Sequence, residues 1–292
     1  MQEELVNYKQ HFKNKIVLCN CDNPTQSMFW KYFHLNFKVL GLKKLISTYY
    51  DDTKTVYKTE YMGGNDNDIT VGIKTPLKGD GDFHSLECLN ILKEADIVVT
   101  NPPFSLAREF VSCLVKHKKK FVIVGNLNWI TYKNVFPLLK DNKVWIGCRG
   151  LNKDMYFDVP DEYKEWLVEN KREGSAYKII NDCVYGRLAS ICWFTNLDHK
   201  KRHERKLNTT HLYEPSLYQK YDNCDAININ KVSEIPMNYD GIMGVPVTFM
   251  DKYNPEQFEI LGIDKDLTNN HKACMINGKQ TYKRIFIRKK KI

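Results

Sequence analysis

Short apolar runs alternate with amphipathic stretches along the first 145 residues of the chain. The apolar runs have the length and the β-branched content of buried strands, and they lie at 15–19, 44–50, 96–100, 120–124 and 144–147. Apolar residues at helical spacing occupy 27–40, 85–93 and 106–116. A loop-rich stretch after the second strand is expected to form a hairpin with 69–71. This alternation predicts an α/β fold, a mostly parallel sheet with helices on both faces.

The residue composition of the chain changes near residue 150. Beyond it aromatic and charged residues dominate, as in MYFDVPDEYKEWLVENKREGSAYKII. Strand patterns return in GIMGVPVTFMDKYNPEQFEILGI, which has a turn signal at Asn254-Pro255. We therefore divide the chain into segments 1–150 and 151–292. The second segment is compatible with further strands of the same sheet as well as with a separate lobe.

Three of the expected strands end in polar residues. The stretches that follow them are Asn20-Cys21-Asp22-Asn23-Pro24, Asp51-Asp52 and Asn101-Pro102-Pro103-Phe104. The carboxyl ends of parallel strands meet at one edge of a sheet, which is where ligands bind in such folds. We therefore expect these side chains to line one site. A tight polar turn, Gly79-Asp80-Gly81-Asp82, lies shortly before the third of these strands.

Composition narrows the class of protein. A hydrophobic content of 42% and five Trp indicate a folded globular chain. No apolar run has the length of a membrane span and the N-terminus has no apolar signal region, so we expect a cytoplasmic protein with no membrane partner. Nine Cys without a CxxC pair indicate reduced thiols, and the single CxC at Cys19 and Cys21 is only a weak metal signal. The formal charge of +9 is compatible with a polyanionic partner.

The stretch Asn101-Pro102-Pro103-Phe104 carries the clearest chemical signal. Proline stiffens the backbone and removes N–H donors, which leaves nearby carbonyl groups available as acceptors. Together with the side-chain oxygen of Asn101, they provide rigid acceptors suited to an exocyclic amine with two hydrogens. Phe104 offers a flat apolar face on which a base can stack. The set suits alkylation of an amine on a nucleobase.

Asn-Pro-Pro-Phe after an apolar strand resembles the catalytic motif of amino-group DNA methyltransferases. Longer stretches extend the likeness: CDNPTQSMFWKYFHLNFKVLGLKKLISTYYD, KGDGDFHS, ADIVVTNPPFSLAREFV, EGSAYKIINDCVYGRLASICWFTNLDHKKRHE and GVPVTFMDKYNPEQFEILGI. Together they resemble the EcoRI-type adenine-specific DNA methyltransferase family over about residues 7 to 290. The resemblance implies a Rossmann-like sheet that binds S-adenosylmethionine and performs catalysis in segment 1–150. It implies the remaining strands and a DNA target-recognition region in segment 151–292.

The resemblance also implies roles for individual residues. Asn101, Pro102, Pro103 and Phe104 match the catalytic motif and would hold an adenine flipped out of the duplex. Asn20, Asp22 and Asn23 end the first strand, where the family binds the cofactor, and CNCDNP replaces the usual glycine-rich turn. Asp51 or Asp52 is expected to bind the ribose hydroxyls, and spacing does not decide between them. Asp80 and Asp82 match the third cofactor position, near the adenine ring of the cofactor. For Asp51, Asp52 and Asp80, simple turn residues are the alternative interpretation.

Two further stretches are candidates for DNA contact. Trp193 is expected either to line the base pocket or to pack in an ordinary core strand. The basic stretch 199–206 is interpreted as a phosphate-contacting cluster, with a solvated surface segment as the alternative. Its cationic members are Lys200, Lys201, Arg202 and Arg205. His199 and His203 stand four residues apart, but their cationic neighbours disfavour a metal ion, and we expect no metal site.

We therefore expect a monomeric, site-specific DNA adenine methyltransferase whose partner is double-stranded DNA. A cognate restriction endonuclease that shares the site is a candidate second partner. The competing hypotheses are an RNA or protein amine methyltransferase and a DNA-binding family member with impaired catalysis. The hypothesis of impaired catalysis concerns a segment that the resemblance leads us to expect and that we do not find in this sequence. It is an Asp-Glu-Phe-Tyr-Thr-like stretch that helps bind the methionine end of the cofactor. Relatives carry it before the first helix, and this sequence begins within that helix, at MQEELVNYKQ.

Overall fold

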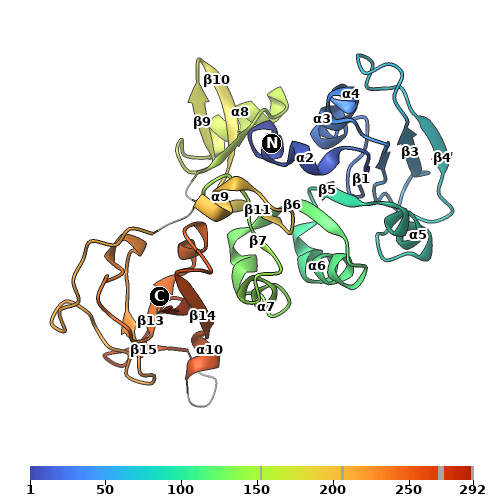
Figure 1. Cartoon of the computed structure of the whole chain (residues 1–292). Helices are drawn as coiled ribbons and strands as arrows, with labels where there is room; N and C mark the ends of the chain where they lie inside the picture. Colours follow the sequence, from blue (N-terminus) through green and yellow to red (C-terminus); the bar gives the residue numbers. More distant parts are fainter. Residues whose placement is uncertain (152, 205–206, 269–272, 291–292) are drawn as a thin grey trace.

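The computed structural model describes residues 1–151, 153–204, 207–268 and 273–290 of the chain. Its centre is an eight-stranded sheet in the order β4-β3-β2-β1-β5-β6-β11-β7 (Figure 1). The strands are β1 (Ile16–Cys19), β2 (Lys44–Ser47), β3 (Tyr57–Tyr61), β4 (Ile73–Pro76), β5 (Ile97–Thr100), β6 (Lys120–Asn126), β7 (Trp145–Ile146) and β11 (Ile191–Thr195). The four central strands, β2, β1, β5 and β6, are parallel, whereas β3, β4 and β11 pair antiparallel with their neighbours. The predicted α/β fold is confirmed.

Helices cover both faces of this sheet (Figure 1). One face carries α1 (Gln2–Leu5), α2 (Lys9–Phe12), α3 (Met28–Leu35) and α4 (Phe37–Leu40), and the other carries α5 (Leu86–Glu94), α6 (Ala107–Lys116) and α7 (Phe136–Lys140). Alternate residues of a strand point to opposite faces. In β1, Val17 and Cys19 accordingly join the apolar cluster under α3, and Ile16 and Leu18 join the cluster that contains α5 and α6.

Several element boundaries differ from the sequence-based prediction. The strand predicted at 44–50 ends at Ser47 as β2, and β6 extends to Asn126. The expected helix 27–40 is interrupted at Asn36, whose side-chain amide donates to the carbonyl oxygen of Tyr32 at 2.8 Å. Asparagine competes in this way with the backbone bonds that would continue a helix. In the hairpin, the second strand is β4 and not 69–71, because Asp68 accepts hydrogen bonds from the backbone and hydroxyl of Thr70 and so holds these residues in a turn.

Segment 151–292 contributes to the main sheet and also forms separate sheets. β11 lies between β6 and β7, so the main sheet contains strands from both sides of residue 150. A three-stranded sheet consists of β8 (Met155–Phe157), β10 (Cys183–Leu188) and β9 (Tyr177–Ile180), with α8 (Asp161–Asn170) in the same region. A C-terminal lobe contains β12 (Ile227–Asn228), β13 (Met243–Pro246), β17 (Arg284–Lys289) and β14 (Phe258–Ile263), together with the pair β15 (Met275–Ile276) and β16 (Lys279–Gln280).

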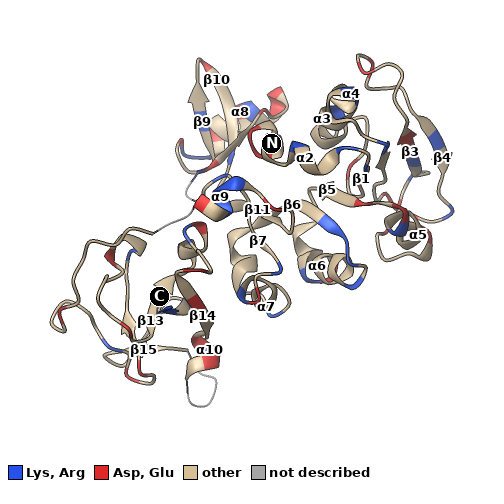
Figure 2. Ribbon diagram, in the orientation of Figure 1, with Lys and Arg blue, Asp and Glu red and all other residues tan. Residues whose placement is uncertain are grey.

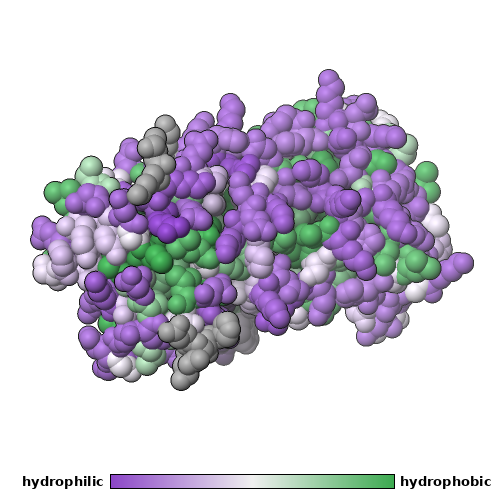
Figure 3. Space-filling view, turned by 60° about the horizontal axis from the view of Figure 1, so that its bottom comes forward, coloured by the Kyte–Doolittle hydropathy of each residue, from purple (hydrophilic) through white to green (hydrophobic). Residues whose placement is uncertain are grey.

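Short helices complete the description. The remaining α-helices are α9 (Lys200–Glu204) and α10 (Asp264–Leu267). The described 3-10 helices are η1 (Val6–Tyr8), η2 (Phe104–Leu106), η3 (Leu127–Thr131), η4 (Val232–Glu234) and η5 (Val247–Asp251). Across the described ranges, we find no helix with the length and apolar content needed to cross a bilayer. Hydrophilic side chains cover most of the face seen in Figure 3, and apolar side chains form separate patches on it.

Candidate active site at the carboxyl edge of the sheet

A cavity of about 1300 Å³ lies where the carboxyl ends of β1, β2 and β5 meet. The chain leaves β1 toward β2 on one side and places β5 on the other side, so the cavity sits at the point where the strand order reverses. Pockets for one drug-sized ligand measure about 300–1,000 Å³. The cavity therefore has room for a cofactor and a nucleobase together. The predicted site residues that line it are Asn20, Asp22, Asn23, Asp51, Asp80, Asp82, Asn101, Pro102, Pro103, Phe104 and Trp193.

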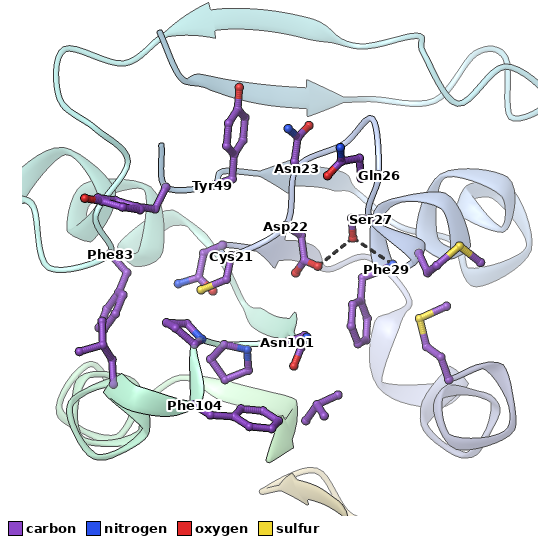
Figure 4. A pocket seen from close by; sticks show the side chains of 18 of the residues that line it. Cys21, Asp22, Asn23, Gln26, Ser27, Phe29, Tyr49, Phe83, Asn101 and Phe104 are labelled. Atoms are coloured by element: carbon purple, nitrogen blue, oxygen red, sulfur yellow. Dashed lines mark hydrogen bonds between the residues drawn. The ribbon is translucent and has the colours of Figure 1, made fainter. Parts of the chain in front are cut away.

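The Asn-Pro-Pro-Phe stretch forms one wall of the cavity. β5 ends at Thr100, and the two prolines carry the chain away from the sheet into η2. Asn101 is exposed toward solvent, and within the described ranges no hydrogen bond engages its side-chain amide. Phe104 is 38% exposed, and the ring of Trp129 supports it edge-on at a centroid separation of 5.6 Å. The motif thus presents a polar amide and a firmly seated aromatic ring to the cavity (Figure 4).

Asp22 lies in the middle of the site, between Ser27 and the start of the catalytic stretch (Figure 4). Its carboxylate accepts hydrogen bonds from the hydroxyls of Thr100 at 2.5 Å and Ser27 at 2.8 Å, and the nearby backbone N–H of Asn101 also favours its charged form. Burial raises the pKa of Asp22 to about 6, although these hydrogen bonds act in the opposite direction. Desolvation therefore outweighs these favourable interactions at this carboxylate.

Three buried polar atoms in the cavity wall have no partner within the described part of the protein, and one of them is the Nε of Arg149. The other two are the side-chain oxygen of Asn20, a residue 7% exposed, and the indole nitrogen of Trp193, a residue 1% exposed. A buried polar atom without a hydrogen bond costs about 1–3 kcal/mol, so such atoms need an explanation. Since both residues line the cavity, a polar ligand bound there can satisfy an acceptor and a donor at once. These atoms therefore suit a ligand end that carries both a donor, such as an amine, and an acceptor, such as a carboxylate.

The end of β2 distinguishes between the two candidate aspartates. Asp51 lines the cavity and Asp52 does not. One oxygen of Asp51 accepts from the hydroxyl and the backbone of Thr53 and from the backbone of Lys54, and these bonds, those of Thr53 foremost, lower the pKa of Asp51. Asp51 is therefore a carboxylate at neutral pH, and its second oxygen remains available to hydroxyl donors.

The Gly79–Asp82 turn packs directly against the loop that follows β2. Its backbone joins that loop through a bond from the N–H of Asp51 to the carbonyl oxygen of Asp80, at 3.0 Å. Gly81 has φ +81°, and a Cβ at this position would lie 1.8 Å from the carbonyl oxygen of Tyr49. Only glycine allows this approach. Asp80 and Asp82 both line the cavity, and Asp82 also accepts from the backbone and ring of His84.

A family model described as "Adenine-specific methyltransferase EcoRI" matches residues 1–290. This chain belongs to that family. It is 43% identical to the Type II methyltransferase M.EcoRI of Escherichia coli, over 100% of this chain and 91% of the relative. It is 38% identical to the Type II methyltransferase M.MgeORF184P of Mycoplasma genitalium (100% and 93% covered) and 36% identical to the Type II methyltransferase M.MpnI of Mycoplasma pneumoniae (98% and 91% covered). No solved structure has significant similarity to the chain.

The comparisons confirm the resemblance found in the sequence. They also confirm the predicted enzyme class, a site-specific adenine methyltransferase that acts on DNA. A methyltransferase of this family requires a methyl donor. The roles of individual residues stay predictions that rest on the geometry above.

The sequence did not predict one further part of the cavity wall. It is built by the three-stranded sheet, and its residues are Met155, Tyr156, Phe157 and Leu188. Tyr156, Phe157 and Leu188 are between 36% and 49% exposed. The only local signal was the aromatic pair in MYFDVP, and this pair gives no indication of which cavity it faces.

The first helix supports a neighbouring part of the wall. Glu4 is buried, and its carboxylate accepts from the backbone N–H groups of Cys148 and Arg149, both at 2.7 Å, and from the hydroxyl of Tyr8. These bonds attach α1 to the loop that follows β7. Met1 and Arg149 both line the cavity as a result.

The predicted phosphate-contacting cluster has mixed surroundings. Lys200, Lys201 and Arg202 belong to α9, near the junction of the main sheet and the C-terminal lobe (Figure 2). Lys201 donates to the carbonyl oxygen of Cys148 and to Asp251, and Arg202 pairs with Asp198 and stacks 3.7 Å above the ring of Trp145. Lys200 is exposed. Arg205 lies outside the described residues. Internal partners therefore already engage two cations of the cluster, Lys201 and Arg202. DNA contact by the cluster stays a prediction.

The histidines of the same stretch have separate environments. His199 is buried with its Nε2 3.1 Å from the carbonyl oxygen of Ile146, and His203 pairs with Asp198. In the parts of the chain that the structure describes, no group of three or more His, Cys, Asp or Glu side chains stands close enough to hold a metal ion.

Proposed function

We propose that this protein transfers a methyl group from S-adenosylmethionine to the exocyclic amine of an adenine flipped out of a short duplex DNA site. The observation that carries the proposal is the position of Asn101 and Phe104, which lie at the carboxyl end of β5, in a cavity large enough for a cofactor and a base. The named relatives are Type II methyltransferases, and we extend that class to this chain.

Cofactor binding is assigned to the ends of β1 and β2 and to the Gly79–Asp82 turn. We assign the ribose hydroxyls to Asp51, because it lines the cavity as a carboxylate and Asp52 does not. The unpartnered oxygen of Asn20 is assigned to the methionine end, and Asp80 and Asp82 to the region of the adenine ring. When bound, S-adenosylmethionine supplies the methyl group in electrophilic form.

The remaining chemistry belongs to the catalytic stretch. The side-chain oxygen of Asn101 and a carbonyl beside the prolines accept the two hydrogens of the target amine, which directs its lone pair into the cavity. Phe104 stacks on the base, and Trp129 prevents Phe104 from moving away. A general base is not needed before the transfer, since the proton can leave afterward. Catalysis in this proposal rests on positioning and on fixed acceptors.

Base flipping is required because the amine is paired inside the duplex. The exposed aromatic residues of the three-stranded sheet, Tyr156 and Phe157, also line the cavity and complete the pocket for the base. The exposed cation Lys200 is a candidate phosphate contact on α9. We further propose that the protein acts as a monomer, with or without a cognate restriction endonuclease that shares its site.

The test is methyl incorporation from labelled S-adenosylmethionine into duplex DNA, RNA and protein, by wild type and by Asn101→Ala. We expect incorporation into DNA adenine alone, and a loss of at least about 100-fold in Asn101→Ala with DNA binding within a factor of about three. Asn67→Ala is the matched control, because Asn67 is exposed and lies outside the cavity. Wild-type turnover by Asn101→Ala, or incorporation into RNA or protein instead of DNA, contradicts the proposal. Sequencing of DNA from cells that express the chain then identifies the methylated site.

A further inference from the structure

The two central strands separate at their carboxyl ends, and a side chain bridges the gap between them. The ladder between β1 and β5 ends at the pair Leu18 and Val98, whereas β1 stays paired with β2 as far as Cys19. Beyond Val98, no ladder pair between these two described strands holds the catalytic stretch in place. The separation opens the cavity and leaves the β1 side of the catalytic stretch without ladder contacts, while β6 still pairs with β5 as far as Thr100.

Asp22 spans this gap. It lies three residues beyond β1, and its carboxylate accepts a hydrogen bond from the hydroxyl of Thr100 at 2.5 Å, beside the backbone N–H of Asn101 that also favours its charged form. The same carboxylate accepts a hydrogen bond from the hydroxyl of Ser27, the residue that caps the N-terminus of α3. One buried group thereby joins three elements: the loop after β1, the first turn of α3 and the last residue of β5.

The contacts of Asp22 are internal. A carboxylate has about four acceptor positions, and the hydroxyls of Ser27 and Thr100 occupy two of those of Asp22. Asp22 is 7% exposed and Thr100 is fully buried. Asn20, in contrast, lies two residues away and has a buried oxygen with no partner among the described residues. The loop after β1 thus contains one residue that remains available to a ligand and another that binds the catalytic stretch.

We propose that Asp22 is a positioning residue, which holds Thr100 and Asn101 in the geometry for methyl transfer and couples the cofactor loop to the catalytic stretch. The inference rests on the proposed function, because it concerns the step that Asn101 performs. Loss of the Asp22 carboxylate lowers the rate of the chemical step much more than it lowers the affinity for the cofactor, since a displaced acceptor misaligns the target amine.

The test compares Asp22→Asn, Thr100→Val and Thr100→Ser with wild type. Thr100→Val keeps the shape of the side chain and removes its hydroxyl, and Thr100→Ser keeps the hydroxyl. The measurements are the dissociation constant of S-adenosylmethionine by calorimetry and kcat with both substrates saturating. We expect Asp22→Asn and Thr100→Val to lower kcat by roughly 10- to 100-fold, with the dissociation constant within about threefold of wild type. Thr100→Ser should retain most of the activity.

Two kinetic results would overturn the inference. One is a dissociation constant raised about tenfold or more in Asp22→Asn with kcat unchanged, which would make Asp22 a cofactor ligand. The other is a wild-type kcat in Thr100→Val.

If the wild type methylates no DNA, the proposed function is refuted. The contact between Asp22 and Thr100 can then still be tested by thermal unfolding. Non-additive shifts of Tm in the double variant Asp22→Asn/Thr100→Val support the contact between the two residues, and additive shifts overturn it.

Discussion

Replacing Asp22 by Asn should change how the stability of this protein depends on pH. In the folded chain, burial raises the pKa of Asp22 to about 6, whereas the ordinary value is 3.8. The carboxyl group therefore holds its proton to a higher pH when the protein is folded than when it is unfolded. Stability from this group is fully present below the unfolded value and is lost as the pH rises through about 6. The amide of the Asp22→Asn variant does not titrate, so the variant lacks this dependence.

The size of the effect follows from the difference between the two pKa values. One pKa unit corresponds to about 1.36 kcal/mol, so the full change is about 3 kcal/mol. Between about pH 4.5 and pH 7.5, where unfolded Asp is already mostly ionised, the change is about 2 kcal/mol. The nearby thiols of Cys19 and Cys21 do not interfere, because burial raises the pKa of each well above its usual range.

The assay is urea unfolding of wild type and Asp22→Asn, monitored by tryptophan fluorescence at both pH values. Other titrating groups are common to the two proteins and cancel in the difference between them. We expect wild type to lose about 2 kcal/mol of unfolding free energy relative to the variant on going from about pH 4.5 to pH 7.5. A difference that is constant with pH, or a wild type that gains stability relative to the variant, would refute the argument that desolvation dominates at this carboxylate.

Three further substitutions test the walls of the cavity. Asn20→Ala should raise the dissociation constant of S-adenosylmethionine about tenfold in calorimetry, because a hydrogen bond to a charged group contributes about 1.5–3 kcal/mol; an unchanged constant would remove Asn20 from the cofactor site. Asp51→Asn should raise the same constant by roughly tenfold while Asp52→Asn leaves it unchanged, since only Asp51 lines the cavity; the reverse order would exchange their roles. Gly81→Ala should lower Tm and cofactor affinity through a destabilisation of about 2 kcal/mol or more. Gly79→Ala should match wild type, because an added Cβ there meets nothing within 4 Å. Equal melting curves for the two variants would contradict the steric argument.

Local pattern in the sequence was enough for the sheet strands that carry the site. β1, β5 and β6 appear where the apolar runs predict them, because a fully buried parallel strand requires a continuous run of apolar residues. The motif at Asn101–Phe104 also lies where the pattern predicts, since two prolines at the end of such a strand cannot continue it. The resemblance to a family then supplied an enzyme class that no local pattern contains.

Contacts between distant parts of the chain decided the remainder. The exclusion of Asp52 from the cavity, the wall formed by Tyr156 and Phe157, and the bridge from Asp22 to Thr100 all depend on residues far apart in sequence. Asp22 and Thr100 are 78 positions apart, and only the pairing of β1 with β5 brings them together. The sequence by itself determined which strands form and which chemistry their ends carry, because burial and proline geometry act locally. Tertiary structure alone decided which of these side chains face a ligand and which face one another, because that depends on how the strands separate at the edge of the sheet.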